Sequence, residues 1–120
     1  MTDQYLQLEL QNQVATVWIN RPELHNAFNS QVIEELDGCF QHLNTLEDIR
    51  VVILAGRGKS FSAGADLNWM KQAADSSQAD NEADALKLAK MLQSLATLYR
   101  LWWGYGFGFC LRYLCRKSRC

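Results

Sequence analysis

Proline, histidine and long apolar runs are scarce in this chain of 120 residues. There is one proline, Pro22, and there are two histidines. No stretch approaches the roughly 18 apolar residues that a membrane-spanning helix needs, so we expect no membrane partner. The four cysteines follow no zinc-ligand spacing, and the sequence predicts no metal site. The cysteines are Cys39, Cys110, Cys115 and Cys120.

Acidic residues are absent from residues 99–120, which hold five basic residues and three of the four cysteines. Residues 1–98 hold all 13 acidic residues and seven basic ones, a net charge of −6 beside +5 for the second segment. The whole chain carries only −1, so we expect no electrostatic binding to nucleic acid. A change in composition as sharp as this needs an explanation of its own.

A targeting signal is also missing. The N-terminus reads MTDQYLQLEL and lacks a basic stretch followed by an apolar core. We therefore expect a cytoplasmic protein with reduced cysteines. At 120 residues the chain is one domain at most, or part of a larger one.

The first half of the chain has the pattern of an α/β fold. Apolar and polar residues alternate over Tyr5–Leu10, a polar turn follows, and Val14–Ile19 is rich in β-formers, which predicts an N-terminal hairpin. Asn29 or Ser30 can cap a helix whose apolar residues recur at spacings of three and four. The run Val51–Leu54 predicts another strand, and a strand–helix–strand order favours parallel pairing.

The stretch Gly56–Met70, GRGKSFSAGADLNWM, follows this strand and leads into a short helix expected over residues 66–72. The polar segment Ala73–Asp80 is interpreted as a mobile loop, and apolar residues in 86–98 predict a second long helix. A strand, a loop of small residues and a helix start together present backbone N–H groups to an anion. The loop is therefore the candidate functional site.

Two nucleotide-binding interpretations of this loop are weak. A phosphate loop requires glycine at the position of Ile53, so that motif fails. A dinucleotide fingerprint fits Gly56 and Gly58 but has Phe61 in place of its third glycine.

An oxyanion hole for a thioester is the third interpretation. The segment Ser62–Asp66 places small residues where a backbone must approach a ligand closely. The N–H of Ala65 would then point from the helix N-terminus at a carbonyl oxygen, and such a donor is commonly worth ~3 kcal/mol in a transition state. A plain strand-to-helix connection, capped by Asp66, explains the same spacing without a ligand.

The segment Val14–Leu98, about 85 of the 120 residues, resembles the N-terminal half of the crotonase, or enoyl-CoA hydratase/isomerase, superfamily. The matching motifs are VATVWINRPELHNAFN, DIRVVILAGRGKSFSAGADL and the helix that ends SLATL. The resemblance implies an α/β crotonase-like fold of repeated ββα turns wound as a superhelix, usually assembled as a trimer or hexamer. It also implies an acyl-CoA thioester as substrate, so that coenzyme A is no separate cofactor. The continuation DLNWMK looks most like the branch that hydrates methylglutaconyl-CoA in leucine breakdown.

The resemblance implies roles for individual residues of this chain. The N–H of Ala65 matches one of two donors to the thioester oxygen. The residues that match the segment lining the CoA and acyl site are Ala63, Gly64, Asp66 and Leu67. The residues that match a loop contacting CoA are Glu23, Leu24 and His25.

Four further residues have two interpretations each. Arg21 and Lys59 either contact CoA phosphates or are solvated surface charges. Trp69 and Met70 either line the acyl pocket or pack in an ordinary core.

The resemblance stops after Leu98. Family members continue with a Pro-containing strand, a GGG-x-G-L…CDIA segment that supplies the second oxyanion donor, and a later catalytic glutamate. This chain instead reads YRLWWGYGFGFCLRYLCRKSRC, without a carboxylate. Tryptophan has one codon, so a one-base shift turns Trp102-Trp103 into Gly-Gly, and the shifted frame permits GGG-(M/T)-G-L-V-x-x-C-D-I. We therefore expect a frameshifted tail from about Tyr99.

A genuine arm for a membrane surface or a partner is the alternative explanation of the tail. Glycines at alternate positions disfavour a stable amphipathic helix there.

The sequence thus predicts a truncated crotonase-like fragment, with residues 1–98 as its folded part and 99–120 as an atypical tail. It carries one oxyanion donor and lacks the second donor and the glutamate. We therefore expect little or no hydratase activity and a marginally stable, association-prone product. The second hypothesis is a non-catalytic fragment that binds CoA or joins an oligomer.

Overall fold

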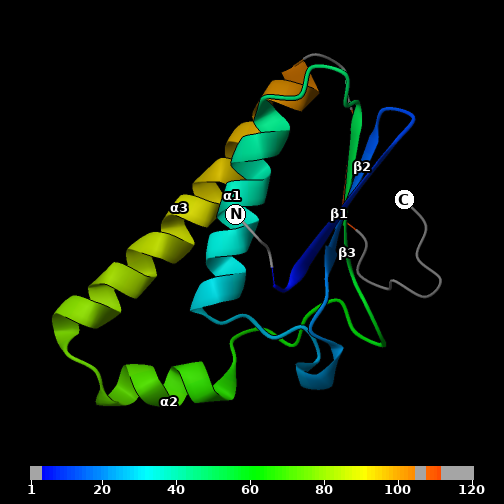
Figure 1. Cartoon of the computed structure of the whole chain (residues 1–120). Coiled ribbons are helices and arrows are strands. Elements are labelled where there is room, and N and C mark those ends of the chain that lie inside the picture. Colours follow the sequence, from blue (N-terminus) through cyan, green and yellow to red (C-terminus); the bar gives the residue numbers. More distant parts are fainter. Residues whose placement is uncertain (1–3, 105–107, 112–120) are drawn as a thin grey trace.

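A four-stranded sheet with two long helices on one face forms the body of the protein (Figure 1). The computed structural model describes residues 4–104 and 108–111. The strands lie in the order β1-β2-β3-β4, and α2 projects beyond the end of the sheet. The α/β class is therefore confirmed. The elements in chain order are β1 (Leu6–Gln11), β2 (Val14–Ile19), η1 (Pro22–Leu24), α1 (Ser30–Asn44), β3 (Val51–Gly56), α2 (Leu67–Asp75), α3 (Gln78–Gly104) and β4 (Gly108–Leu111).

The predicted N-terminal hairpin is present, and its tight turn uses left-handed backbone. β1 and β2 pair antiparallel up to Gln11 opposite Val14, which leaves Asn12 and Gln13 as a two-residue loop. Both have positive φ, 51° and 69°, as in a type I′ turn, whose twist matches that of the strands. The carbonyl oxygen of Gln13 also accepts the N–H of Arg50 at 2.8 Å, which ties the turn to the start of β3.

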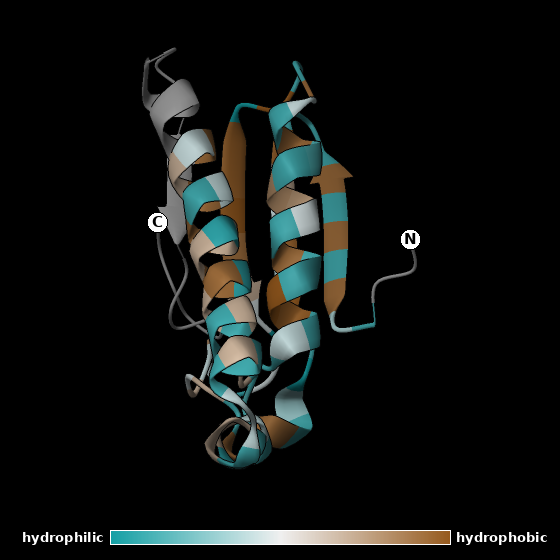
Figure 2. Ribbon diagram, turned by 90° about the vertical axis from the view of Figure 1, so that its left-hand side faces the viewer, coloured by the Kyte–Doolittle hydropathy of each residue, from teal (hydrophilic) through white to brown (hydrophobic). Residues whose placement is uncertain are grey.

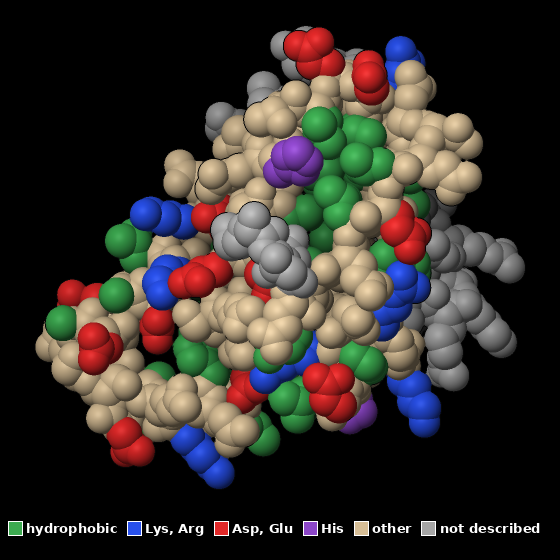
Figure 3. Space-filling view, viewed as in Figure 1, with side chains coloured by type: hydrophobic (Ala, Val, Ile, Leu, Met, Phe, Trp, Pro, Cys, Tyr) green, Lys and Arg blue, Asp and Glu red, His purple; other side chains and the backbone are tan. Residues whose placement is uncertain are grey.

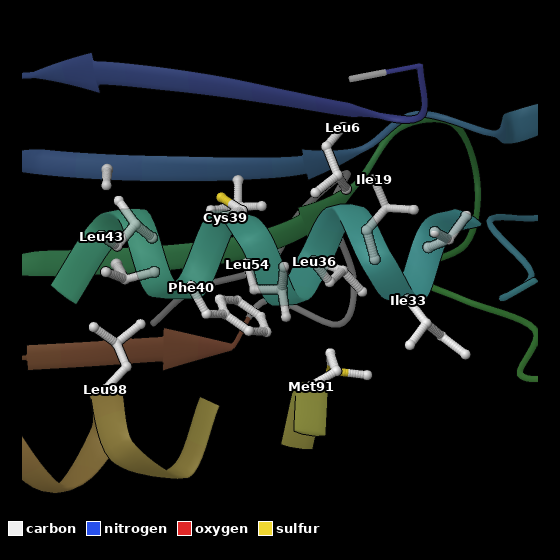
Figure 4. Packing of buried hydrophobic residues seen from close by; sticks show 14 of the residues in the cluster. Leu6, Ile19, Ile33, Leu36, Cys39, Phe40, Leu43, Leu54, Met91 and Leu98 are labelled. Carbon is white, nitrogen blue, oxygen red and sulfur yellow. The ribbon is translucent and has the colours of Figure 1, made fainter. Parts of the chain in front are cut away.

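Helix α1 lies at the centre of the core (Figure 4). Asn29, one of the two predicted caps, accepts the N–H of Val32 on its side-chain oxygen at 2.9 Å. Figure 4 shows Ile19 of β2 on one side of α1 and Leu98 of α3 on the other. The predicted apolar face of the helix is buried between these two layers. Its buried apolar residues are Val32, Ile33, Leu36, Cys39, Phe40 and Leu43.

The sheet turns one apolar face toward the helices. Buried and half-buried residues alternate along β2, and Ala15, Val17 and Ile19 are fully buried. β3 pairs parallel with β2, with Val14 opposite Val51, which confirms the predicted pairing. Figure 2 shows the helices in front of the sheet: one strand is brown along its length, and another alternates brown and teal.

The segment Ala73–Asp80 is helical for most of its length, so the predicted mobile loop is wrong. α2 continues to Asp75 and α3 begins at Gln78. Between them, Ser77 Oγ accepts the N–H of Asp80 at 3.2 Å, which begins the second helix. The residues around this break are almost all exposed. A helix without a buried face shows no apolar periodicity, and the prediction depended on that periodicity.

The segment 99–120 is described only in part. Residues 99–104 extend α3 without a break, and 108–111 form β4, which pairs parallel with β3. The other positions of the predicted tail lie outside the described residues. A backbone fold does not report the reading frame of a gene, so the frameshift stays a prediction. Within the described part of the chain, no helix is long and apolar enough to cross a membrane.

Replacing Gln13 by glycine should stabilise the hairpin. A residue with a Cβ pays ~1 kcal/mol for left-handed backbone, and glycine removes this cost while adding flexibility to the unfolded chain. We expect Gln13→Gly to raise the free energy of unfolding by about 0.5 kcal/mol in urea denaturation. The matched control is Gln13→Ala, which removes the same side-chain atoms beyond Cβ. Equal stability of the two variants would contradict this explanation.

Candidate functional site

Two loops meet at one end of the sheet, and backbone hydrogen bonds join them. One loop connects β2 to α1 and includes η1; the other connects β3 to α2. Ala63 donates its N–H to the carbonyl oxygen of His25 at 2.9 Å, and Phe28 donates to that of Gly64 at 2.7 Å. Asp66 donates to the carbonyl oxygen of Phe28 at 2.8 Å. The two segments that the sequence predicted to share a site are therefore neighbours.

Ala65 lies in the middle of this contact and takes no part in its hydrogen bonds. Phe28 and Ala65 form an isolated parallel bridge, in which Phe28 bonds the residues on either side of Ala65. The alternation of an extended chain turns the N–H of Ala65 to the opposite side. Ala65 is exposed, and no described residue accepts its N–H. The loop therefore presents a directed N–H donor at the surface.

The direction of this N–H comes from the bridge and not from a helix terminus. α2 begins at Leu67, and Asp66 is its cap, so Ala65 precedes the helix. The expectation that its N–H belongs to the helix N-terminus is therefore wrong. The capping role of Asp66, considered as an alternative for this loop, is confirmed.

Asn26 holds the loop after β3 against the loop after β2. It is fully buried; its Oδ1 accepts the N–H of Arg21 at 2.8 Å, and its Nδ2 donates to the carbonyl oxygens of Arg57 at 2.8 Å and Ser60 at 2.7 Å. Its own carbonyl oxygen accepts Ser62 Oγ at 2.8 Å. A buried amide thus satisfies backbone groups that the loops leave unpaired. Sequence reasoning did not single out Asn26, because no pattern separates it from a surface asparagine.

A buried ion pair supports the same contact. Arg21 and Asp66 are only 7% and 5% exposed, and Arg21 Nη1 lies 2.8 Å from Asp66 Oδ2. The same nitrogen donates to the carbonyl oxygen of Ala27 at 2.9 Å. Asp66 Oδ1 accepts the N–H of Trp69 at 3.0 Å. Both oxygens of the carboxylate are therefore engaged within the protein.

These contacts hold the pKa of Asp66 below its ordinary value. The hydrogen bond from the Trp69 N–H is the largest cause, burial opposes it, and Arg21 contributes a hydrogen bond and its positive charge. A carboxylate with a lowered pKa stabilises the fold above the carboxyl pKa of the unfolded chain. That stabilisation is lost as the pH falls through the lowered pKa. The ion pair is therefore intact at neutral pH.

Gly56 and Gly64 are the glycines that this arrangement requires. A Cβ at Gly56 would lie 2.5 Å from the carbonyl oxygen of Phe61 and 2.7 Å from the Asn26 side chain, so no side chain fits at the end of β3. Gly64 has a φ of 93°, which residues with a Cβ rarely adopt. This turn precedes the bridge and helps to place Ala65 opposite Phe28.

The residues predicted to bind CoA and the acyl group lie in the two joined loops and, for Leu67, at the first position of α2. All but one are exposed. Asp66 is the exception, because its carboxylate is buried against Arg21 and Trp69. Its contacts stabilise the loop and do not reach the surface. The exposed ones are Glu23, Leu24, His25, Ala63, Gly64 and Leu67.

The structure shows where the four residues with two interpretations each lie, namely Arg21, Lys59, Trp69 and Met70. The surface-charge interpretation of Arg21 is wrong, because its guanidinium is buried in an ion pair; its contact with a CoA phosphate stays a prediction. Lys59 is exposed, as either of its interpretations requires. Trp69 is half-buried and packs against the core, whereas Met70 is 53% exposed.

A cavity of about 300 Å³ opens beside the ion pair, between the first residues of α1 and α2. Most of its lining residues are polar or charged, although polar and apolar atoms contribute equally to its walls. Among the described residues, no three His, Cys, Asp or Glu side chains gather in a way that can hold a metal ion. The cavity is lined by Arg21, Asn29, Ser30, Gln31, Asp66, Asn68, Trp69 and Gln72.

Comparison with known proteins relates this arrangement to one family. The family model for enoyl-CoA hydratase/isomerase matches residues 9–98. The mitochondrial Delta(3,5)-Delta(2,4)-dienoyl-CoA isomerase of Mus musculus is 38% identical over 90 residues, which cover 75% of this chain and 27% of that protein. A short-chain-enoyl-CoA hydratase of Clostridium acetobutylicum is 44% identical over 66 residues, 54% of this chain and 25% of that protein.

Solved structures give the same relationship. An enoyl-CoA hydratase from Shewanella pealeana matches with a TM-score of 0.75 at 38% identity and covers 78% of this chain. A Legionella pneumophila protein of the enoyl-CoA hydratase/isomerase (crotonase) type matches with a TM-score of 0.80 at 29% identity and covers 92%. The chain spans 35% and 40% of the lengths of these two proteins. It belongs to the enoyl-CoA hydratase/isomerase (crotonase) family and carries the N-terminal part of the family's fold.

Proposed function

We propose that this chain binds an acyl-CoA thioester and holds the thioester oxygen on the N–H of Ala65. The observation that carries the proposal is the exposed N–H, which hydrogen bonds on both sides of Ala65 hold in one direction. A donor fixed before the ligand arrives needs no reorganisation when charge develops on the oxygen. Hydration or isomerisation of an enoyl-CoA develops such charge, because the thioester carbonyl becomes an enolate.

The surface around Ala65 fits this ligand class. Leu24, in the loop after β2, is 42% exposed, and Leu67, the first residue of α2, is 73% exposed; both offer apolar surface. Ala63, like Ala65, is small and exposed, so the backbone stays accessible. A site that combines apolar surface with a few directed polar groups is typical of small-molecule binding. Lys59, exposed on the same loop, is a cation for a CoA phosphate.

We propose further that the chain alone does not catalyse the reaction. Proton transfer to or from an enoyl thioester needs an acid or base near the carbonyl. The acid next to Ala65 is Asp66, and it is buried and bonded to Arg21 and Trp69. The family resemblance places the catalytic glutamate and the second N–H donor after the SLATL helix, and the family match ends at residue 98.

The acyl group and the cellular location are also proposals. The motif DLNWMK motivates methylglutaconyl-CoA, whereas the two relatives above are named for dienoyl-CoA and short-chain enoyl-CoA. We therefore propose an enoyl-CoA as the substrate class and the methylglutaconyl group as a hypothesis within it. The cytoplasmic location is proposed from the N-terminal sequence, although the mouse relative is named as mitochondrial.

A non-catalytic fragment that joins an oligomer is the second candidate. Leu8 and Leu10 of the edge strand β1 are 36% and 51% exposed, although Leu8 lies opposite the buried Val17 of β2. Hydrophobic side chains reach the surface on one face of the molecule (Figure 3). An apolar edge strand pairs readily with another chain. A trimer or hexamer would bury this edge.

Thioester binding should be measurable without turnover. We expect the 120-residue chain to bind crotonyl-CoA in isothermal titration calorimetry, because the N–H of Ala65 is accessible. The absorbance of the enoyl double bond should stay constant in the same solution, because the carboxylate next to Ala65 in the chain, that of Asp66, is bonded to Arg21 and to the N–H of Trp69. Turnover comparable with that of full-length family enzymes would contradict the proposed lack of catalysis. Absence of binding, with a trimer or hexamer in light scattering, would favour the second candidate.

Replacing Ala65 by proline should remove the donor and spare the loop. Proline has no N–H, and no described residue depends on this one. We expect Ala65→Pro to keep its free energy of unfolding within ~1 kcal/mol and to lose the infrared shift of a bound, isotope-labelled thioester carbonyl. The matched control is Ala63→Pro, which removes the hydrogen bond to His25 and should cost ~1–3 kcal/mol of stability. A carbonyl shift retained in Ala65→Pro would exclude Ala65 as the donor.

The nucleotide sequence across codons 95–120 and beyond tests the proposed truncation. We expect a one-base shift near codon 99 to restore a family-like frame that includes the glycine-rich segment and, later, the glutamate. If no single-base shift restores such a frame, residues 99–120 are a genuine arm. Reading the gene is decisive because protein chemistry cannot detect an alternative frame.

A further inference from the structure

We infer that Arg21 is a positioning residue for the N–H of Ala65 and acts as a clamp across the contact between the two loops. The inference rests on the proposed function of Ala65 and extends it to a residue that touches no ligand. Neither motif spacing nor the resemblance indicates this role, because both are compatible only with a phosphate contact or a surface charge at Arg21.

One nitrogen of Arg21 reaches both sides of the Phe28–Ala65 bridge. Nη1 donates to the carbonyl oxygen of Ala27, directly before Phe28, at 2.9 Å. It also lies 2.8 Å from Oδ2 of Asp66, directly after Ala65. The guanidinium is planar and donates in fixed directions. Arg21 therefore sets the spacing of the two segments at the point where the Ala65 N–H is aimed.

The surroundings of Arg21 leave its side chain little freedom. The backbone of Arg21 is held first: its backbone N–H donates to Asn26 Oδ1 at 2.8 Å, and its carbonyl oxygen accepts the backbone N–H of Asn26 at 2.9 Å. The guanidinium carbon lies 5.1 Å from the centre of the Tyr5 ring, within the range of a cation–π interaction. Because the ion pair is buried, removing one partner leaves the other charge unpaired in a poorly solvated place. These contacts therefore hold the guanidinium of Arg21 in one position.

The two oxygens of Asp66 have separate tasks, which makes the clamp testable. Oδ1 caps α2 through the N–H of Trp69, and Oδ2 pairs with Arg21. Loss of Arg21 leaves the cap available, so α2 should persist. The tie across the bridge is lost at the same time. Loss of Arg21 should therefore disturb the alignment of the Ala65 N–H with a bound thioester while the helix content stays the same.

The experiment measures how strongly the full chain stabilises the enolate of acetoacetyl-CoA. This β-keto thioester ionises to an enolate with its own near-ultraviolet absorbance, and a donor on the thioester oxygen favours that form. We expect the unaltered chain to raise the enolate fraction of the bound thioester above that in solution at the same pH. Arg21→Met should lower the ratio of bound enolate to keto form about tenfold. The Kd for coenzyme A itself, which has no thioester carbonyl, should change less than about twofold.

Two further variants separate the clamp from a general effect of charge. Arg21→Lys keeps the charge but not the planar fork, so its enolate ratio should lie between those of Arg21→Met and the unaltered chain. Arg57→Met is the matched control. Arg57 also pairs with a carboxylate, Glu9 at 3.2 Å, but lies outside the bridge, and its loss should leave the enolate ratio unchanged.

The outcomes are distinguishable. If Arg21→Met is folded by circular dichroism and keeps the full enolate ratio, the positioning role is overturned while the proposed function stands. If Arg21→Met does not fold, Asp66→Asn tests the same clamp, because an amide oxygen can still cap α2 but carries no charge for Arg21. An unchanged enolate ratio in Asp66→Asn overturns the role. If the unaltered chain binds no acetoacetyl-CoA, the proposed function fails and this inference fails with it.

Discussion

The backbone contact between Phe28 and the residues on either side of Ala65 determines the geometry of the candidate site. Two hydrogen bonds, at 2.7 and 2.8 Å, run from one residue to Gly64 and Asp66 and leave the peptide N–H between them turned outward. The contact joins two loops outside the sheet, so their remaining polar groups need partners from elsewhere. Asn26 and Arg21 supply them, and the site depends on both side chains being buried.

The sheet and helices place these loops where they can meet. β2 and β3 are parallel neighbours, so the loops that follow them leave from the same edge, where open α/β sheets commonly bind ligands. α1 is packed between the sheet and α3, which holds the first residues of α1 close to the loop after β3. The hydrophobic core thus supports the site from below. The hydrogen bonds of Asn26 and Arg21 complete the site, because a loop lacks the regular backbone hydrogen bonds of a strand.

In the proposed function, the described residues form one side of a binding site. They supply a directed N–H, an apolar rim from Leu24 and Leu67, and a rigid support whose nearest carboxylate is already bonded. The chain spans only 35–40% of the two solved relatives described above. These features support the proposal that the chain binds and orients a thioester without catalysing its conversion. The distinction between binding and catalysis follows from the position of Asp66, which faces inward.

Much of the fold was predictable from the sequence, because it depends on neighbours in the chain. Alternation marked β1 and β2, the spacing of apolar residues marked α1, and Asn29 marked its start. Such periodicity could not indicate the join between α2 and α3, because its residues are almost all exposed. It could not indicate β4 either, because a strand of four residues is too short to show a period. The motif around Ala65 located the candidate donor through its resemblance to the family.

The sequence by itself therefore determined the main strands and helices up to α3, the family and the position of the candidate donor along the chain. The tertiary structure decided where that donor points, through Phe28, and what holds it, through Asn26 and the Arg21–Asp66 pair. These contacts join residues far apart in the chain, and no spacing encodes them. A buried arginine and a surface arginine also look alike in a sequence. Only the folded structure shows which arginine is buried away from water and therefore needs a charged or hydrogen-bonding partner.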